Sequence, residues 1–305
     1  MLSVLLGLGG ALIFGAADFL GGIASRRISA IRVTAVGGLA GLVVLVLVLQ
    51  VTGGVWSLPA VALGATAGVT GAFAISLLYA CLAIGPMSIL SPLTAVVSAI
   101  VPLTAGVLRG EQLPPLGYAA LALALVAIVL VGFVPDRKAV RPSAKALLMA
   151  VGAGTFIGAF LIIIDLTPDD SGVIPLMASR AVNASLLFST IGVLTLVAAG
   201  RRRRAARAAV PDAGTGLSSV RGRTGGNWRP GLRLAIACGS LDATANVLVL
   251  IGLRGGDLSI IAVLVAMYPA GTIILAAVLL KERITPTQLL GLVMAIAAAA
   301  MLALV

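Results

Sequence analysis

Long apolar runs separated by short polar corners dominate this chain. A helix needs roughly 20 mostly apolar residues to cross the hydrocarbon core of a bilayer, and ten segments are of that kind. Lipid accommodates only helices and closed barrels, and the runs lack the strict alternation of barrel strands. The pattern therefore predicts an all-α membrane protein with ten transmembrane helices. We expect the spans at residues 3–24, 32–51, 60–85, 87–108, 114–134, 146–164, 173–198, 232–253, 258–280 and 287–305.

Two of the predicted hairpins follow one pattern. Aligned without gaps, residues 88–132 and residues 259–303 share 13 identical pairs out of 45. Many of those pairs are Ala, Leu or Val, which composition alone can match. The alignment therefore depends mainly on Glu111, which falls on Glu282, and on a proline that follows four residues later in both copies.

The repeat divides the chain into two halves of five spans each. Residues 1–134 form the first half, a charged linker follows at 135–145, and residues 146–305 form the second half with a basic loop at 199–231. Because five is an odd number, the second half must enter the membrane in the opposite direction from the first. Such an inverted repeat is typical of secondary transporters.

The composition agrees with a membrane protein and excludes several kinds of chemistry. The chain is 60% hydrophobic and 10% charged, whereas soluble domains carry about 25% charged residues. Histidine is absent, so we expect no imidazole proton relay and no metal site. Cys81 and Cys238 lie inside apolar runs, which indicates small buried side chains instead of a disulfide. No phosphate-binding or dinucleotide-binding loop is present, so we expect no cofactor and no ATP-driven transport by this chain alone.

The basic residues are distributed unevenly between the two membrane faces. We name the face that carries the N-terminus side A and the opposite face side B. Side B loops hold 18 Lys and Arg residues and side A loops hold two, namely Arg109 and Arg254. Cytoplasmic loops collect positive charge, which predicts that side B is cytoplasmic and that both termini lie outside.

The basic loop at 199–231 contributes much of the net charge of +11. It is rich in Gly and Ala, so we expect it to be disordered and to touch anionic lipid. It has one aromatic residue, Trp228, and no fold of its own, so we do not expect nucleic-acid binding.

Polar side chains inside the predicted spans are the first functional candidates, because charges there usually face the bundle interior. Asp18 lies in the first span and is either a proton-coupling carboxylate or a helix-end residue paired with Arg26 or Arg27. Arg180 and Asp242 lie at similar depths on consecutive antiparallel spans. They form either a structural ion pair or a clamp in which Arg180 binds a substrate carboxylate.

Other residues complete the predicted site. Asn246 follows Asp242 by one helical turn on the same face. Phe14, Tyr79 and Tyr268 would supply apolar walls. Tyr268 precedes a proline that removes a helical hydrogen bond, which predicts a kink in the ninth span. Two prolines in the fourth span, its repeat partner, predict a similar kink there.

Several of these motifs resemble those of the EamA-type transporters of the drug/metabolite transporter superfamily. They are the corner residues 110–113 (Gly-Glu-Gln-Leu) and 281–284 (Lys-Glu-Arg-Ile), the segment 14–22 in the first span, and Ser179-Arg180-Ala181 in the seventh. The resemblance implies an alternating-access carrier, often an exporter of amino acids, other small metabolites or toxic compounds, with a central cavity lined by spans one, three, four, six, eight and nine.

The sequence departs from that family in two respects. Gly37 stands where the repeat would place a first-half counterpart of Arg180, so the clamp is not duplicated. Ten-span members commonly have cytoplasmic termini, whereas the charge count predicts termini outside the cell.

These observations favour a proton-coupled secondary transporter of a small organic metabolite, amino acid or drug in the bacterial inner membrane, acting as an exporter and as a monomer or homodimer. The alternatives are a flippase for a lipid-linked precursor and, more remotely, a membrane-embedded enzyme that modifies lipid. The expected partners are the substrate, the proton and the lipid bilayer. The residues assigned to substrate binding and coupling are Phe14, Asp18, Tyr79, Arg180, Asp242, Asn246 and Tyr268.

Overall fold

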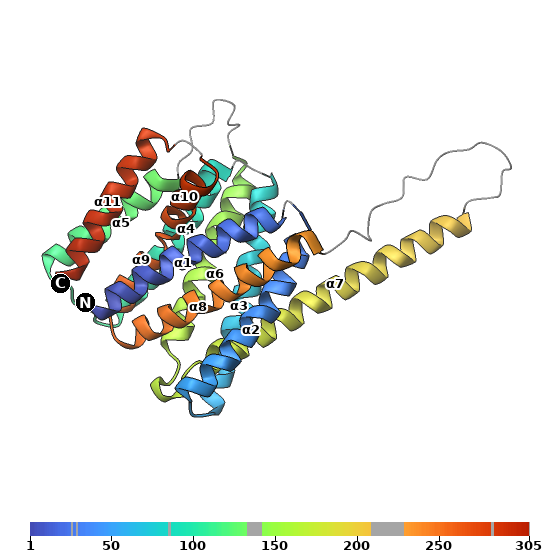
Figure 1. The fold of residues 1–305 in the computed structure, drawn as a ribbon, viewed down its shortest axis with the longest axis horizontal. Helices are drawn as coiled ribbons and strands as arrows, with labels where there is room; N and C mark the ends of the chain where they lie inside the picture. Colours follow the sequence, from blue (N-terminus) through green and yellow to red (C-terminus); the bar gives the residue numbers. More distant parts are fainter. Residues whose placement is uncertain are drawn as a thin grey trace.

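The fold of the chain is an all-helical bundle (Figure 1). The computed structural model describes residues 1–25, 27–28, 30–84, 87–132, 142–208, 229–281 and 284–304. The helices of the first half are α1 (Leu2–Ser25), α2 (Ala30–Thr52), α3 (Leu58–Ile84), α4 (Met87–Leu108) and α5 (Pro115–Gly132). Those of the second half are α6 (Ala144–Asp165), the short 3-10 turn η1 (Asp169–Ser171), α7 (Ile174–Ala208), α8 (Arg229–Arg254), α9 (Leu258–Val265), α10 (Tyr268–Leu279) and α11 (Pro286–Ala303).

Ten long apolar elements account for these helices, as the sequence predicts. Within the described residues, nine segments are long and apolar enough to cross a membrane, and α9 and α10 together make one of them. The long helix α7 supplies the remaining element, because its first part is apolar and its last part is basic. The chain is therefore a multi-pass membrane protein with two groups of five spans.

The two halves pack mainly against each other. Helix α1 packs on α8, and the equivalent helix of the second half, α6, packs on α3. In the same way α2 packs on α8 and α7 on α3, while α5 and α11 pack together (Figure 1). Each pairing thus has a counterpart when the halves are exchanged, as expected for copies related by a pseudo-two-fold axis.

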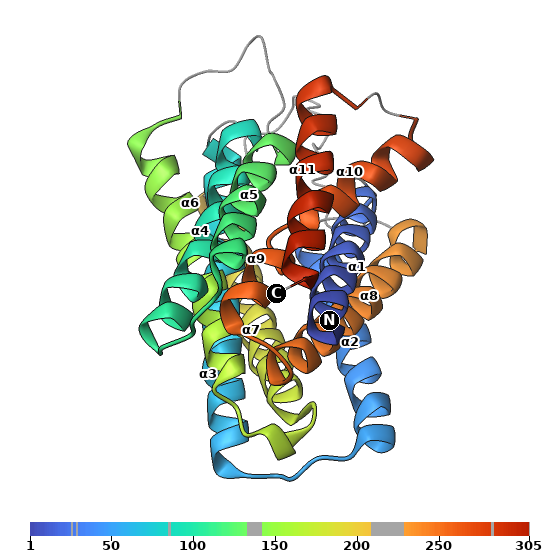
Figure 2. The ribbon, with the colours of Figure 1, turned by 90° about the vertical axis from the view of Figure 1, so that its left-hand side faces the viewer.

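The loops of side A show that the repeat is inverted. The hydroxyl of Ser3, at the start of α1, donates a hydrogen bond of 2.6 Å to the carbonyl oxygen of Gly255. Asp165, at the end of α6, accepts a bond of 2.7 Å from Arg109 on the same face. Helix α1 therefore leaves side A, whereas its counterpart α6 arrives there. Both chain termini lie close together at this end of the bundle (Figure 2).

Small residues allow the helices of opposite halves to approach closely. A Cβ atom on Gly68 of α3 would lie 2.5 Å from the carbonyl oxygen of Ser179 on α7. On α6, a Cβ on Gly154 would lie 2.6 Å from the carbonyl oxygen of Thr94 on α4. Membrane helices associate through such close contacts, because lipid removes the hydrophobic driving force between them.

The ninth span is divided at the place where its proline predicts a kink, whereas the fourth span is one continuous helix, so the kink expected there stays a prediction. The ninth span is divided into α9 and α10 at Ala266 and Met267, directly before Tyr268 and Pro269. Helix α4 instead runs unbroken through both of its prolines. The repeat places Ser98 opposite Pro269, and a serine keeps the backbone N–H that proline lacks.

The start of the basic loop also differs from the sequence prediction. We expected disorder from residue 199 onward, but α7 continues as a helix to Ala208. Alanine and arginine are both strong helix formers, and no proline interrupts the chain before Pro211. The remainder of the loop, 209–228, and most of the charged linker, 133–141, lie outside the described residues.

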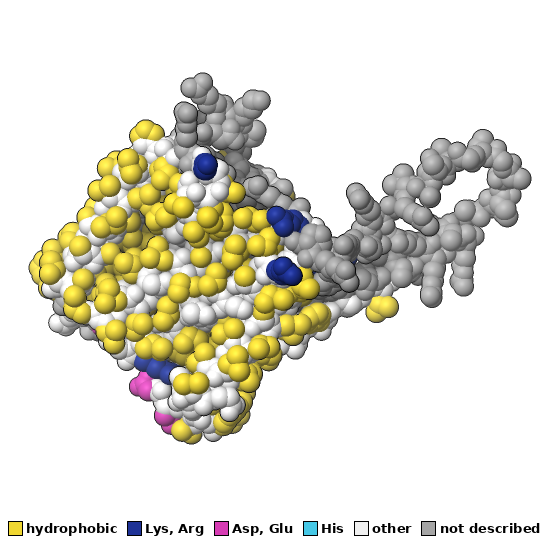
Figure 3. All heavy atoms as spheres, viewed as in Figure 1, with side chains coloured by type: hydrophobic (Ala, Val, Ile, Leu, Met, Phe, Trp, Pro, Cys, Tyr) yellow, Lys and Arg dark blue, Asp and Glu magenta, His cyan; other side chains and the backbone are white. Residues whose placement is uncertain are grey.

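Hydrophobic side chains cover the face of the bundle shown in Figure 3. Asp and Glu side chains gather at one margin of this face, and several Lys and Arg side chains lie toward the opposite margin. Exposed Leu47, Leu148 and Ile296 contribute to the apolar surface of the bundle. A protein of this kind exposes such a surface to lipid instead of water.

Two glycines on α2 and α8 test the close packing between halves. A Cβ on Gly239 would overlap the backbone of Gly37, whereas a Cβ on Gly38 would meet nothing within 4 Å. Gly239→Ala should therefore lower the free energy of unfolding by about 1–3 kcal/mol, the usual cost of overpacking. Gly38→Ala, the matched control, should be neutral or stabilising. Thermal unfolding of the purified protein in detergent measures both, and equal stability of the two variants would contradict the packing.

Candidate functional site

An ion pair between Arg180 on α7 and Asp242 on α8 lies inside the membrane-spanning part of the bundle. The two side chains keep 25% and 30% of their surface exposed, so neither is sealed in the core of the bundle. The side-chain amide of Asn246 donates a hydrogen bond of 2.8 Å to the backbone carbonyl of Asp242 and one of 3.4 Å to its carboxylate. The predicted ion pair and the predicted contact of Asn246 are both confirmed as geometry.

Asp18 belongs to the same region from the opposite half. Its side chain is exposed on α1 and lies within electrostatic reach of Cys238 on α8 and Tyr268 on α10. Cys238 lies equally within reach of Arg180, so it connects Asp18 with the ion pair. Helices α1, α7, α8 and α10 thus bring a carboxylate, a thiol, a phenol and an ion pair into one region.

Close packing between α1 and α10 holds Tyr268 near Asp18. A Cβ on Gly15 would lie 2.7 Å from Cα of Gly271, so these glycines let the two helices touch. The hydroxyl of Thr272 donates 3.3 Å to the carbonyl oxygen of Gly15. Helix α10 therefore begins beside α1, one turn before Asp18.

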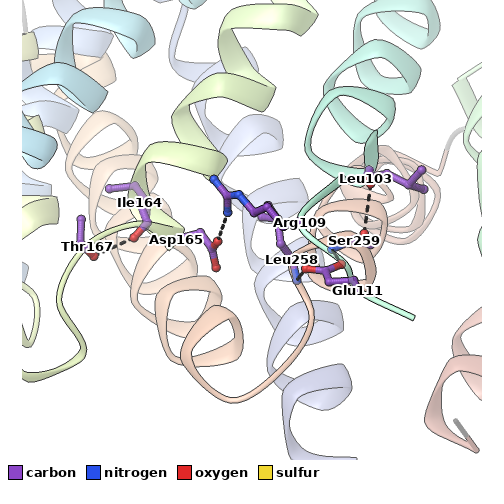
Figure 4. Close-up of polar contacts among 8 residues, drawn as sticks. All are labelled: Leu103, Arg109, Glu111, Ile164, Asp165, Thr167, Leu258 and Ser259. Carbon is purple, nitrogen blue, oxygen red and sulfur yellow. Dashed lines mark hydrogen bonds and ion pairs between the residues drawn. The ribbon is translucent and has the colours of Figure 1, made fainter. Parts of the chain in front are cut away.

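Side A carries a second polar arrangement, which joins the halves (Figure 4). The carboxylate of Glu111 accepts hydrogen bonds from the backbone N–H groups of Leu258 (2.9 Å) and Ser259 (3.1 Å), the first two residues of α9. The hydroxyl of Ser259 donates 3.2 Å to the carbonyl oxygen of Leu103 on α4. Glu111 thus caps a helix of the other half, because the first N–H groups of any helix lack internal partners.

Arg109, two residues earlier, pairs with Asp165 at 2.7 Å (Figure 4). The ion-pair partner of Arg109 is thus Asp165, because the α4–α5 corner lies against the end of α6. The equivalent Glu282 lies outside the described residues.

Comparison with known proteins identifies the family. A model of the EamA-like transporter family matches residues 1–133 and again residues 144–304, so one family pattern fits each half. The chain belongs to the EamA-like transporter family. No curated protein matches this transporter. A solved structure, described only as the crystal structure of a protein, is similar in fold: the TM-score is 0.70 at 15% identity, over 99% of this chain and 96% of the other.

The transporter gathers most of the predicted site residues, with two qualifications. Phe14 is partly buried and packs against a core cluster that includes Leu45 and Val249, which leaves its role as a wall of the site a prediction. Tyr79 belongs to α3, but its side chain lies outside the described part of the structure. A small crevice between α5, α10 and α11 is apolar and contains none of the polar side chains, so we place the site on the polar cluster.

The sequence reading missed Cys238. We expected a buried hydrophobe, but the side chain is partly exposed and lies within electrostatic reach of both Asp18 and Arg180. A signal was available, because Cys238 and Asp242 are four residues apart and therefore share one face of α8.

A double-mutant cycle measures the ion pair. Arg180→Gln and Asp242→Asn should each cost about 1–3 kcal/mol of stability, since each leaves one charge without its partner inside the membrane. The double variant should cost clearly less than the sum of the two, with a coupling of about 0.5 kcal/mol or more. Unfolding of the purified transporter in detergent provides the three values. Additive costs would contradict a direct pair.

Proposed function

We propose that this transporter is a proton-coupled exporter of a small organic metabolite, amino acid or drug, working by alternating access in a bacterial inner membrane. The observation that carries the proposal is the partly exposed ion pair of Arg180 and Asp242 in the second half, together with Asp18 of the first half, since Cys238 lies within electrostatic reach of both Arg180 and Asp18. Sites of this kind, at the repeat interface within the membrane, are typical of secondary transporters.

The ion pair supports a role in binding a charged substrate. A charge inside a span costs at least about 2.5–3.5 kcal/mol on insertion scales, so such residues are retained where they pair or function. A substrate carboxylate can replace Asp242 as the partner of Arg180. Asn246, already bonded to Asp242, can then donate to the substrate or hold the released carboxylate.

Asp18 supports the coupling role. It is a carboxylate inside the first span, toward the side B end of α1, and its side chain is exposed on that helix. A carboxylate that alternates between a proton and a cationic or polar substrate group can exchange one for the other, and proton relays in transporters use Asp and Glu in this way.

The charge distribution supports an orientation with side B in the cytoplasm. Arg27, Arg32, Lys145 and Arg233 lie at side B ends of described helices, whereas side A carries Arg109 and Arg254. Cysteine accessibility in intact cells, with a cysteine introduced at Asp169 on side A, would distinguish the two orientations.

Transport in inverted membrane vesicles tests the function. Vesicles that contain the transporter should accumulate one or more members of a metabolite panel when a pH gradient is imposed. Asp18→Asn should lose the response to the gradient, because the amide cannot carry a proton, while exchange of substrate without a gradient is retained. Asp169→Asn, which removes an exposed carboxylate on side A, should leave transport unchanged. Full gradient-driven transport by Asp18→Asn would end the coupling assignment.

A further inference from the structure

We propose that Glu111 is a positioning residue that holds side A of the transporter closed by capping α9 across the boundary between the halves. The inference rests on the proposed alternating access, since it assigns the closed face and the contact that must open. Glu111 stands in the α4–α5 corner of the first half, and α9 belongs to the second. Both of its carboxylate oxygens accept backbone N–H groups of α9.

The backbone of the corner places Glu111 for this task. The N–H of Gly110 donates to the carbonyl of Val107, and the N–H of Glu111 donates to that of Gly106. This is a Schellman motif, and Gly110 has the positive φ of +93° that the motif requires. A Cβ on Gly106 would lie 2.6 Å from Cδ of Glu111, so glycine is needed for the side chain to fold back over the end of α4.

Helix α9 depends on this external cap. Asp257 occupies its N-cap position, yet the Asp257 side chain makes no capping hydrogen bond. Burial and the nearby charge of Glu111 raise the pKa of the Asp257 carboxyl above its usual value. Of the two carboxylates near the start of α9, Glu111 therefore supplies the cap, although it comes from 147 residues earlier in the chain.

Helix α9 is a short, separate and buried helix. Every residue from Leu258 to Leu264 is buried, and the helix packs on α4 and α1. The chain then breaks at Ala266 and Met267 before α10 begins. Helix α9 is thus fixed to the first half at side A, while α10 packs separately on α1 through Gly271, beside Asp18.

Other contacts on side A also hold the two halves together. Arg109 pairs with Asp165, Ser3 bonds Gly255, and the N–H of Val55 donates 2.9 Å to the carbonyl of Asp170. Each of these links joins one half to the other. Opening side A requires the α4–α5 corner to leave α9, and this exposes N–H groups that only water can then satisfy.

A native cysteine reports the opening. The chain has two cysteines, so Cys81→Ala leaves Cys238, beside the polar cluster, as the single thiol. The rate of its labelling by a membrane-impermeant sulfonated thiol reagent is measured in right-side-out and inverted vesicles. A cysteine at Asp169, in a separate Cys81→Ala Cys238→Ala chain, identifies the vesicles that present side A.

In the Cys81→Ala background, Glu111→Ala should increase labelling from side A about 2- to 30-fold, the population change that matches loss of a helix cap. Glu111→Gln, which keeps one acceptor oxygen, should give a smaller increase. Labelling from side B should stay constant or fall, because the two faces open alternately. The control Asp169→Asn removes a side A carboxylate from the η1 turn and should leave both rates unchanged.

Unchanged labelling of both Glu111 variants from side A would overturn the proposal, and so would an equal rise from both sides, which is the signature of general loosening. If Glu111→Ala does not accumulate in the membrane, Glu111→Gln and Ser259→Ala decide the question, with a rise from side A alone expected for both. This labelling needs no substrate, so it can succeed even if no transported compound is found.

Discussion

Helices in lipid gain nothing by hiding apolar surface from water, so their association depends on close packing and polar contacts. In this transporter the close packing lies between the two halves. Gly68 of α3 meets α7, Gly154 of α6 meets α4, and Gly239 of α8 meets Gly37 of α2. Arg180 and Asp242 both belong to the second half, whereas Asp18 belongs to the first and packs toward Cys238 through the contact of α1 with α8, so the polar cluster is complete only when the halves are assembled. The repeats are consequently units of sequence and symmetry, and the bundle is the unit of folding.

Much of this arrangement could be predicted from local pattern. Runs of apolar residues predicted the number of spans, and the odd number of spans in a half predicted the inversion. The similar depths of Arg180 and Asp242 indicated an ion pair as one of two possibilities. Each of these steps depends on properties of one helix or of two consecutive helices. The proline after Tyr268 likewise gave the break in the ninth span, because loss of an N–H is a local effect.

What could not be predicted depends on contacts between distant segments or on competing tendencies. Nothing near Glu111 in the sequence indicates that its partners are Leu258 and Ser259, since that contact exists only after the corner of one half reaches a helix of the other. Cys238 was predicted to be buried because its sequence neighbours are apolar, although charged groups of Asp18 and Arg180 lie near it in space. The end of α7 was predicted to be disordered because it is highly charged, whereas Ala and Arg favour helix and α7 continues to Ala208.

The two corners of the repeat share one backbone feature, but the helices that lead into them differ. Gly110 and Lys281 occupy equivalent positions and both have positive φ, at +93° and +56°, so the left-handed residue at the end of the helix is shared. Lysine is an unfavourable residue there, because a Cβ makes left-handed backbone cost roughly 1–2 kcal/mol. The shared left-handed residue has thus been kept in spite of strain, while the break before Pro269 occurs in the second half and α4 runs unbroken. Since the backbone frame is symmetric and the broken helix is not, the side A contact made by Glu111 joins a continuous helix to a divided one, and the halves can respond differently when that contact opens.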